Sequence, residues 1–246
     1  MKFLTIILLG CFLCSQVYAA KVQVAVAANF TAPMKQIAQA FEKNTGHKAV
    51  LSFGATGKLY AQITNGAPFD VFLSADDETS ARLEKENSAV PGTSFTYATG
   101  RLVLWSAKAD VVDANGAILL RPTFKHLAIA APKLAPYGKA AIDVMNRLGV
   151  LALLQSTLVM GDSIGQAYGM VASGNAELGF VAMSQVFEAG FLKSGSAWVV
   201  PASLHSPLKQ EAVLLMQAKN NPAALQLLAF LKSPQAKAIM TSFGYE

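Results

Sequence analysis

Residues 159–169, VMGDSIGQAYG, run from a short apolar strand through a tight turn into a helix. A strand followed by a helix is the repeating unit of an open α/β sheet. The turn GDSIG fits the G-x-S-x-G pattern in which hydrolases present a nucleophilic serine, here Ser163. The turn equally suits an anion, because backbone N–H groups at a helix N-terminus lack partners and carry partial positive charge. The rest of the chain has to distinguish a nucleophile from an anion site.

Strands and helices alternate along the whole chain, which predicts an α/β fold. Most of the apolar runs are nearly continuous, as is typical of parallel strands covered on both faces. No flexible linker interrupts them, so two domains would be joined by crossing strands. The expected strands cover residues 21–28, 47–53, 69–75, 100–107, 126–132, 157–161, 178–183, 198–201 and 211–217. The expected helices cover residues 32–46, 56–66, 138–149, 163–174, 221–232 and 233–243.

The first 19 residues have the pattern of a secretory signal peptide, which predicts a periplasmic protein. One basic residue precedes an apolar run, and small residues precede the expected cleavage after Ala19. The apolar run is shorter than the roughly 20 residues of a membrane span. Lipid attachment at Cys11 is a minor alternative. Both cysteines, Cys11 and Cys14, fall in this segment, so the exported chain would have no disulfide and no thiolate site.

Composition and charge favour a globular protein that binds small anions. The chain is 53% hydrophobic and 14% charged, which suffices for a large core. Without Lys2 it carries 19 basic and 15 acidic residues, a net charge of +4 spread thinly along the sequence. No basic cluster alternates with aromatic residues, so nucleic acid is not an expected partner.

Three other helix starts follow a strand and carry polar groups: Asn29, Thr56 and Tyr137. Thr56 stands where a helix cap belongs. The Gly-Lys pair that follows lacks the other residues of a phosphate-binding P-loop. Ligands of open α/β sheets bind beyond the carboxyl ends of the strands. These three turns and the one at Ile164 are therefore predicted to face one small pocket lined with hydrogen-bond donors, with Asp162 capping its own helix.

The hydrolase alternative finds weak support. Downstream of Ser163 the only histidine is His205, with Glu177 or Glu188 as acid, and no oxyanion loop of the HGGG type occurs. His205 is expected to be an exposed loop residue. The other two histidines do not have the spacing of metal ligands. We therefore expect no catalytic residues, no cofactor and no metal held by protein side chains.

Several stretches together resemble the periplasmic molybdate-binding proteins of ABC importers over essentially the whole exported chain. The stretches are AANF (27–30), SFGATG (52–57), DVFLSAD (70–76), APYG (135–138), GDSIGQAYGMVASGNAELGFVAMSQ (161–185) and GYE (244–246). The resemblance implies a two-lobed, type II-like periplasmic binding fold with mostly parallel sheets and the ligand between the lobes. After the signal at 1–19, lobe I is expected at 20–98 plus 206–246 and lobe II at 99–205.

The resemblance also implies a ligand and a partner. Molybdate, and tungstate with it, would be held by Asn29, Thr56, Tyr137 and the backbone at Ile164, and a monomer would deliver it to a membrane permease. The family often has serine at the first two positions. One branch of the family has a tyrosine in the stretch that matches residues 178–184, and this chain has no tyrosine there. In a second branch the phenol comes from another loop, and here Tyr137 would supply it in the same way.

The chemistry of the ion agrees with such a pocket. Deprotonated molybdate only accepts hydrogen bonds, so N–H and O–H donors suit it. Molybdenum would be bound only as the centre of this oxyanion, through the same four residues. Another oxyanion such as sulfate or thiosulfate is the main alternative. A secreted serine hydrolase that uses Ser163 and His205 is the lesser one.

Overall fold

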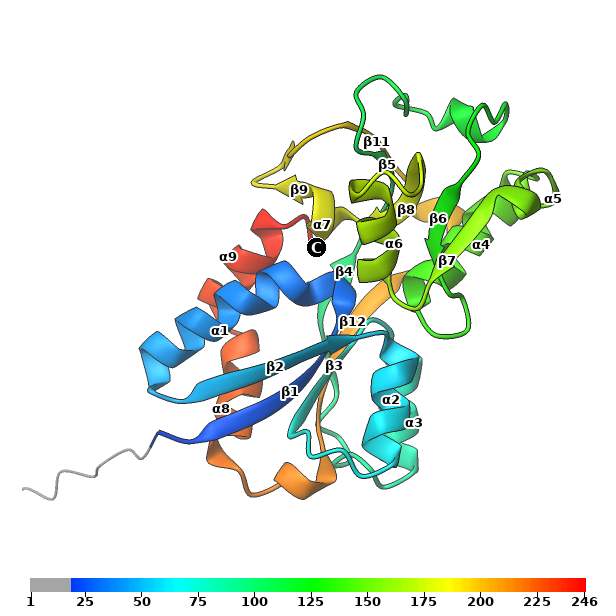
Figure 1. Ribbon diagram of the computed structural model, residues 1–246. Helices are drawn as coiled ribbons and strands as arrows, with labels where there is room; N and C mark the ends of the chain where they lie inside the picture. Colours follow the sequence, from blue (N-terminus) through cyan, green and yellow to red (C-terminus); the bar gives the residue numbers. More distant parts are fainter. Residues whose placement is uncertain (1–18) are drawn as a thin grey trace, which may run out of the picture.

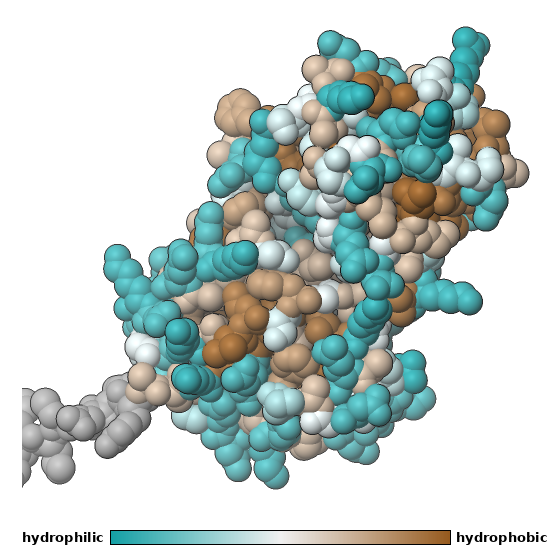
Figure 2. All heavy atoms as spheres, in the orientation of Figure 1, coloured by the Kyte–Doolittle hydropathy of each residue, from teal (hydrophilic) through white to brown (hydrophobic). Residues whose placement is uncertain are grey.

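A computed structural model describes residues 19–246. The expected signal peptide, apart from Ala19, and the two cysteines lie outside these residues. In the described part, no helix is long and apolar enough to cross a membrane. The chain forms two α/β lobes, each built on a five-stranded sheet, and Figure 2 shows them as two masses that meet at a narrower middle.

Lobe I contains the sheet β2-β1-β3-β12-β4 with helices on both faces (Figure 1). Because side chains alternate along a strand, Val22, Val24 and Val26 face one side, where they share a core with the first and the last two helices. Ala25 faces the other side, towards α2 and α3. The elements are β1 (Lys21–Ala27), η1 (Ala28–Phe30), α1 (Thr31–Thr45), β2 (Lys48–Gly54), α2 (Thr56–Thr64), β3 (Val71–Ser74), α3 (Asp77–Lys85), β4 (Phe95–Gly100), β12 (Leu208–Leu214), η5 (Met216–Ala218), α8 (Pro222–Leu231) and α9 (Pro234–Ser242).

Lobe II contains the sheet β11-β5-β8-β6-β7, against which α4 and α6 pack. A two-stranded hairpin, β9–β10, extends from this lobe. The elements are β5 (Leu102–Ser106), η2 (Ala117–Leu119), β6 (Leu127–Ala130), α4 (Pro136–Arg147), α5 (Leu151–Leu154), η3 (Gln155–Thr157), β7 (Leu158–Gly161), α6 (Ile164–Ala172), β8 (Leu178–Ala182), α7 (Met183–Val186), β9 (Phe187–Glu188), β10 (Phe191–Leu192), β11 (Ser196–Val199) and η4 (Ala202–Leu204).

The chain passes between the sheets twice. It leaves sheet I after β4 and enters sheet II at β5, with only Arg101 between them, and it returns after β11 to form β12. In each sheet one strand runs opposite to the other four, and these two strands, β5 and β12, are the ones that follow a crossing. The mostly parallel two-lobed fold expected from the sequence is confirmed.

Candidate functional site

Four helix starts converge on one small cavity between the lobes. Helices η1 and α2 begin there from lobe I, and α4 and α6 begin there from lobe II. The cavity has a volume of about 10 Å³, whereas pockets for drug-sized organic ligands have several hundred Å³. In this conformation the cavity therefore excludes organic ligands of that size. The lining residues are Ala27, Ala28, Asn29, Gly54, Ala55, Thr56, Ala75, Ala135, Pro136, Tyr137 and Ile164.

All four residues expected at the site line this cavity, and none of them is more than 3% exposed. None of the lining residues named above carries a charged side chain. The other lining residues are all Ala, Gly or Pro, which let the backbone approach a bound group closely. Backbone N–H groups in the first turn of a helix have no partner within that helix, so the cavity offers donors and partial positive charge without a countercharge.

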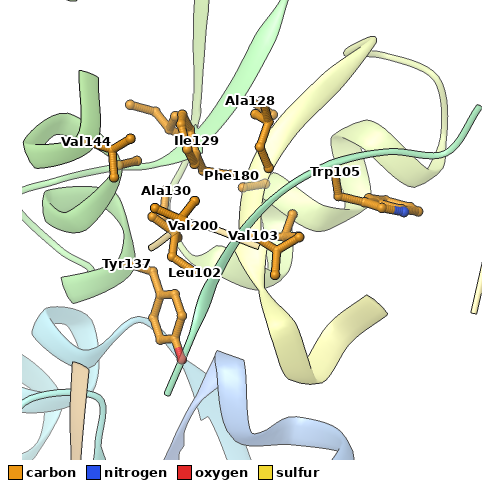
Figure 3. Packing of buried hydrophobic residues seen from close by; sticks show 14 of the residues in the cluster. Leu102, Val103, Trp105, Ala128, Ile129, Ala130, Tyr137, Val144, Phe180 and Val200 are labelled. Carbon is orange, nitrogen blue, oxygen red and sulfur yellow. The ribbon is translucent and has the colours of Figure 1, made fainter. Parts of the chain in front are cut away.

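The phenol of Tyr137 supplies one donor. The side chain is 1% exposed, and within residues 19–246 its hydroxyl has no hydrogen-bond partner. Figure 3 shows the ring leaving the apolar cluster around Leu102 and Ala130, with its oxygen pointing towards lobe I. Burial raises the pKa of Tyr137 well above its usual value, so the hydroxyl keeps its proton at neutral pH. A buried, unpaired hydroxyl costs free energy unless a ligand accepts its hydrogen bond.

Gly100 makes room for this phenol at the end of β4. A Cβ atom at this position would lie 2.1 Å from the Tyr137 oxygen, and the side-chain nitrogen of Gln210 would lie 3.2 Å away. Any larger residue at position 100 would therefore displace the Tyr137 hydroxyl.

Thr56 is the first residue of α2 rather than its cap. The N-cap is Ala55, which has no side-chain oxygen, so the predicted cap is wrong. The Thr56 Oγ1 instead accepts a hydrogen bond from the backbone N–H of Ala75 at 3.2 Å. Because the protein occupies an acceptor site of this hydroxyl, its proton stays available as a donor.

Asn29 lines the cavity, but its side-chain amide is already hydrogen-bonded within the protein. The Nδ2 atom donates to Gln210 Oε1 at 2.6 Å and to the Tyr245 hydroxyl at 2.9 Å. These two bonds use both amide hydrogens. The expected side-chain donor is therefore occupied, and the backbone N–H at the start of η1 remains. Sequence reasoning did not find these two partners, which lie 181 and 216 positions away.

The GDSIG turn holds a helix cap and an inter-lobe ion pair. Ser163 is the N-cap of α6 and its Oγ accepts from the Gln166 N–H at 3.3 Å. The expectation that Asp162 caps this helix is wrong, since its carboxylate lies 2.6 Å from Lys58 Nζ in lobe I. A Cβ at Gly161 would lie 2.7 Å from the Cβ of Gln166. The first glycine of the motif thus permits the close approach of strand and helix.

The histidines lie apart from the cavity lining. His205 is only 6% exposed, contrary to the expectation of an exposed loop residue, and its Nδ1 lies 2.7 Å from the Ser206 carbonyl oxygen. His47 is also buried, and His126 lies 3.9 Å from a Glu177 oxygen. In the described part of the chain, no hydrogen bond joins Ser163 to a histidine, and no group of three His, Cys, Asp or Glu could hold a metal ion.

Two larger grooves flank the cavity between the lobes. One groove, of about 390 Å³, is lined in part by Thr56 and Pro136, which also line the cavity. The other, of about 400 Å³, contains the ion pair of Lys58 and Asp162. The backbone N–H of Gly57 donates to the Leu134 carbonyl across the cleft at 2.9 Å. The cleft is closed in this conformation.

A closed cleft between two α/β lobes, with helix starts around a small uncharged cavity, defines a solute-binding protein. Residues 22–246 match the family of bacterial extracellular solute-binding proteins. The molybdate-binding protein ModA of Azotobacter vinelandii is 58% identical over 92% of this chain and 90% of its own length, and that of Rhodobacter capsulatus is 51% identical over 92% and 88%. The solved periplasmic molybdate-binding protein of Azotobacter vinelandii matches with a TM-score of 0.89 and 42% identity, covering 92% of this chain and 98% of that one. The chain therefore belongs to the bacterial extracellular solute-binding protein family, in the branch of the ModA proteins.

Proposed function

We propose that this protein captures molybdate, and tungstate with it, in the periplasm and delivers the ion as a monomer to the permease of an ABC importer. The proposal is carried by the uncharged, donor-lined cavity at four helix starts, whose lining includes Tyr137, a residue with a buried hydroxyl that has no hydrogen-bond partner in the described residues. The names and high identity of the ModA relatives support the choice of ion. Export would use the signal peptide at residues 1–19.

In this proposal each of the four expected residues contributes donors. Thr56 and Tyr137 donate through their hydroxyls, and Asn29 and Ile164 through their backbone N–H groups. Because the closed lobes exclude water, these dipoles act at a lower local dielectric than at the surface. A fully deprotonated tetrahedral oxyanion needs no acceptor from the protein, which matches a lining without carboxylates. The lobes would divide at 20–98 plus 206–246 and 99–205.

The protein would act without catalysis. The Ser163 Oγ accepts a hydrogen bond as a helix cap, and the relatives are binding proteins. In this role Ser163 orients the turn that presents the Ile164 N–H.

Calorimetric titration of the ligand-free exported chain with a panel of oxyanions tests the proposal. Molybdate and tungstate are expected to bind at micromolar concentration or below, sulfate weakly because its shorter bonds leave some donors out of reach, and phosphate least. Phosphate keeps a proton at pH 7, and burying that proton without an acceptor is costly. Ligand at a hundredfold its Kd should stabilise the fold by about 2.7 kcal/mol, seen as a higher Tm. Sulfate or phosphate binding as tightly as molybdate would refute the choice of ion.

A further inference from the structure

A buried polar cluster surrounds Asn29, one of the residues that line the cavity. The Tyr245 Oη lies 2.9 Å from Asn29 Nδ2 and 3.0 Å from the Asn29 carbonyl oxygen. Ser184 Oγ donates to the same carbonyl at 2.7 Å, and Gln210 Oε1 accepts from the Asn29 amide at 2.6 Å. We call Asn29, Ser184, Gln210 and Tyr245 the Asn29 cluster.

The members of the Asn29 cluster come from separate parts of the molecule. Ser184 lies in α7 of lobe II, Gln210 in the returning strand β12, and Tyr245 follows the last helix. All four side chains are buried, and none of them is charged at neutral pH. Burial raises the pKa of Tyr245 to about 12, so its hydroxyl remains a donor. The cluster therefore fixes the start of η1 from three directions.

We propose that Tyr245 is a positioning residue for ion binding: its hydroxyl fixes both the amide and the carbonyl of Asn29, so that the N–H groups at the start of η1 face the ion. The inference rests on the proposed function. Tyr245 makes two of the four hydrogen bonds to Asn29, and its ring packs edge-on against Phe30 with centroids 5.2 Å apart. When the hydroxyl is lost, the peptide at Asn29 gains freedom that ion binding must then remove.

The chain offers a matched control in Tyr97. Its ring packs on the same Phe30, with centroids 4.9 Å apart, and it too is a buried tyrosine. In the described residues, however, its hydroxyl has no hydrogen-bond partner. Tyr97→Phe and Tyr245→Phe thus each remove a hydroxyl group from a tyrosine that packs on Phe30. Only Tyr245→Phe removes hydrogen bonds to Asn29.

The test compares molybdate Kd values by calorimetry and the ligand-induced rise in Tm for the wild type and these variants. Tyr245→Phe is expected to raise the Kd about tenfold, the loss of roughly one net hydrogen bond, and to reduce the rise in Tm. Tyr97→Phe should leave both unchanged. Ser184→Ala removes the other donor to the Asn29 carbonyl and should raise the Kd several-fold. If Tyr245→Phe does not fold, this variant tests whether the hydrogen bonds to Asn29 support ion binding.

Unchanged Kd values in Tyr245→Phe and Ser184→Ala would overturn the inference. So would an equal loss in Tyr97→Phe, because that result would assign the effect to aromatic packing. A wild-type protein that does not bind molybdate would refute the proposed function instead, so the two failures are distinguishable.

Discussion

Thr56 illustrates how a neutral side chain is aimed at an anion. A hydroxyl can both donate and accept, and here the backbone N–H of Ala75 occupies it as an acceptor. The side chain is 3% exposed, so water does not compete for the remaining proton. The sequence predicted Thr56 at a helix start but could not reveal this bond, because Ala75 follows a different strand.

Thr56→Ala is expected to weaken molybdate binding by roughly 1 to 3 kcal/mol, since one acceptor oxygen of the ion loses its donor in a dry site. The Kd from calorimetry measures the loss. Thr64→Ala, at the other end of α2, is the control, because that hydroxyl bonds only to carbonyl groups of its own helix. An unchanged Kd in Thr56→Ala would remove Thr56 from the site.

Ser163 and His205 are expected to be dispensable for chemistry. With activated esters as substrates, the wild type, Ser163→Ala and His205→Ala should all show no turnover above buffer. The serine serves as a helix cap in α6, and no hydrogen bond joins it to His205 in residues 19–246. Ester hydrolysis that disappears in Ser163→Ala would revive the hydrolase alternative.

At the scale of elements, the apolar runs were the most informative part of the sequence. All nine expected strands and all six expected helices occur, with shifts of a few residues at their ends. The apolar runs did not predict α3, β4 or the short elements α5, α7, β9 and β10. Helix α3 has few apolar residues, although Asp76 as its cap and acidic residues in its first turn are recognisable signals. Strand β4 (FTYATG) lies at the sheet edge and combines two aromatic residues with two threonines, an alanine and a glycine, so it has no continuous apolar run.

The contact between α4 and β6 sets the position of Tyr137. A Cβ at Gly138 would lie 2.1 Å from the Ala130 carbonyl oxygen, so Gly138→Ala must push the helix away from the strand. We expect the free energy of unfolding to fall by about 1–3 kcal/mol and molybdate to bind more weakly, because Tyr137 is the neighbouring residue. Denaturant unfolding and calorimetry measure the two effects.

Gly169→Ala in α6 is the control for that substitution. No atom lies within 4 Å of a Cβ built at Gly169, and alanine favours a helix over glycine by about 0.5–1 kcal/mol. This variant should be slightly more stable than the wild type and bind equally well. If Gly138→Ala behaved in the same way, the close helix–strand contact would not matter for the site.

At the scale of the whole molecule, the site depends on contacts that a sequence does not display. The family resemblance and the helix starts predicted which four residues meet. They could not predict that the Asn29 amide is used by residues about 200 positions away, or that Asp162 pairs with a lysine of the other lobe. Such contacts depend on how the two chain passages between the sheets place one lobe against the other. Local sequence patterns do not encode this placement.

The ion pair between Lys58 and Asp162 is expected to hold the closed state. Both side chains are about half exposed, so the pair is worth at most about 1 kcal/mol. Lys58→Ala should raise the dissociation rate of molybdate by up to about fivefold, measured by stopped-flow competition, with little change in the Tm of the ligand-free protein. Arg82→Ala, which breaks the ion pair between α3 and its C-cap residue Glu86 in lobe I, should leave the rate unchanged. Equal dissociation rates in the two variants would contradict a role of the Lys58–Asp162 pair in holding the closed state.

The absence of charged side chains in the cavity lining has an electrical consequence. Tyr137 is the one ionisable residue among those that line the cavity, and its raised pKa keeps it protonated at neutral pH, so no lining group gains or loses a proton on binding and the full charge of a bound dianion is added to that of the protein. An exported chain of net charge +4 would thus lose half of its charge on loading. Loaded and empty molecules would then migrate differently in an electric field and elute separately from an ion exchanger. The charge of the bound ion alone would thus distinguish the loaded protein from the empty one.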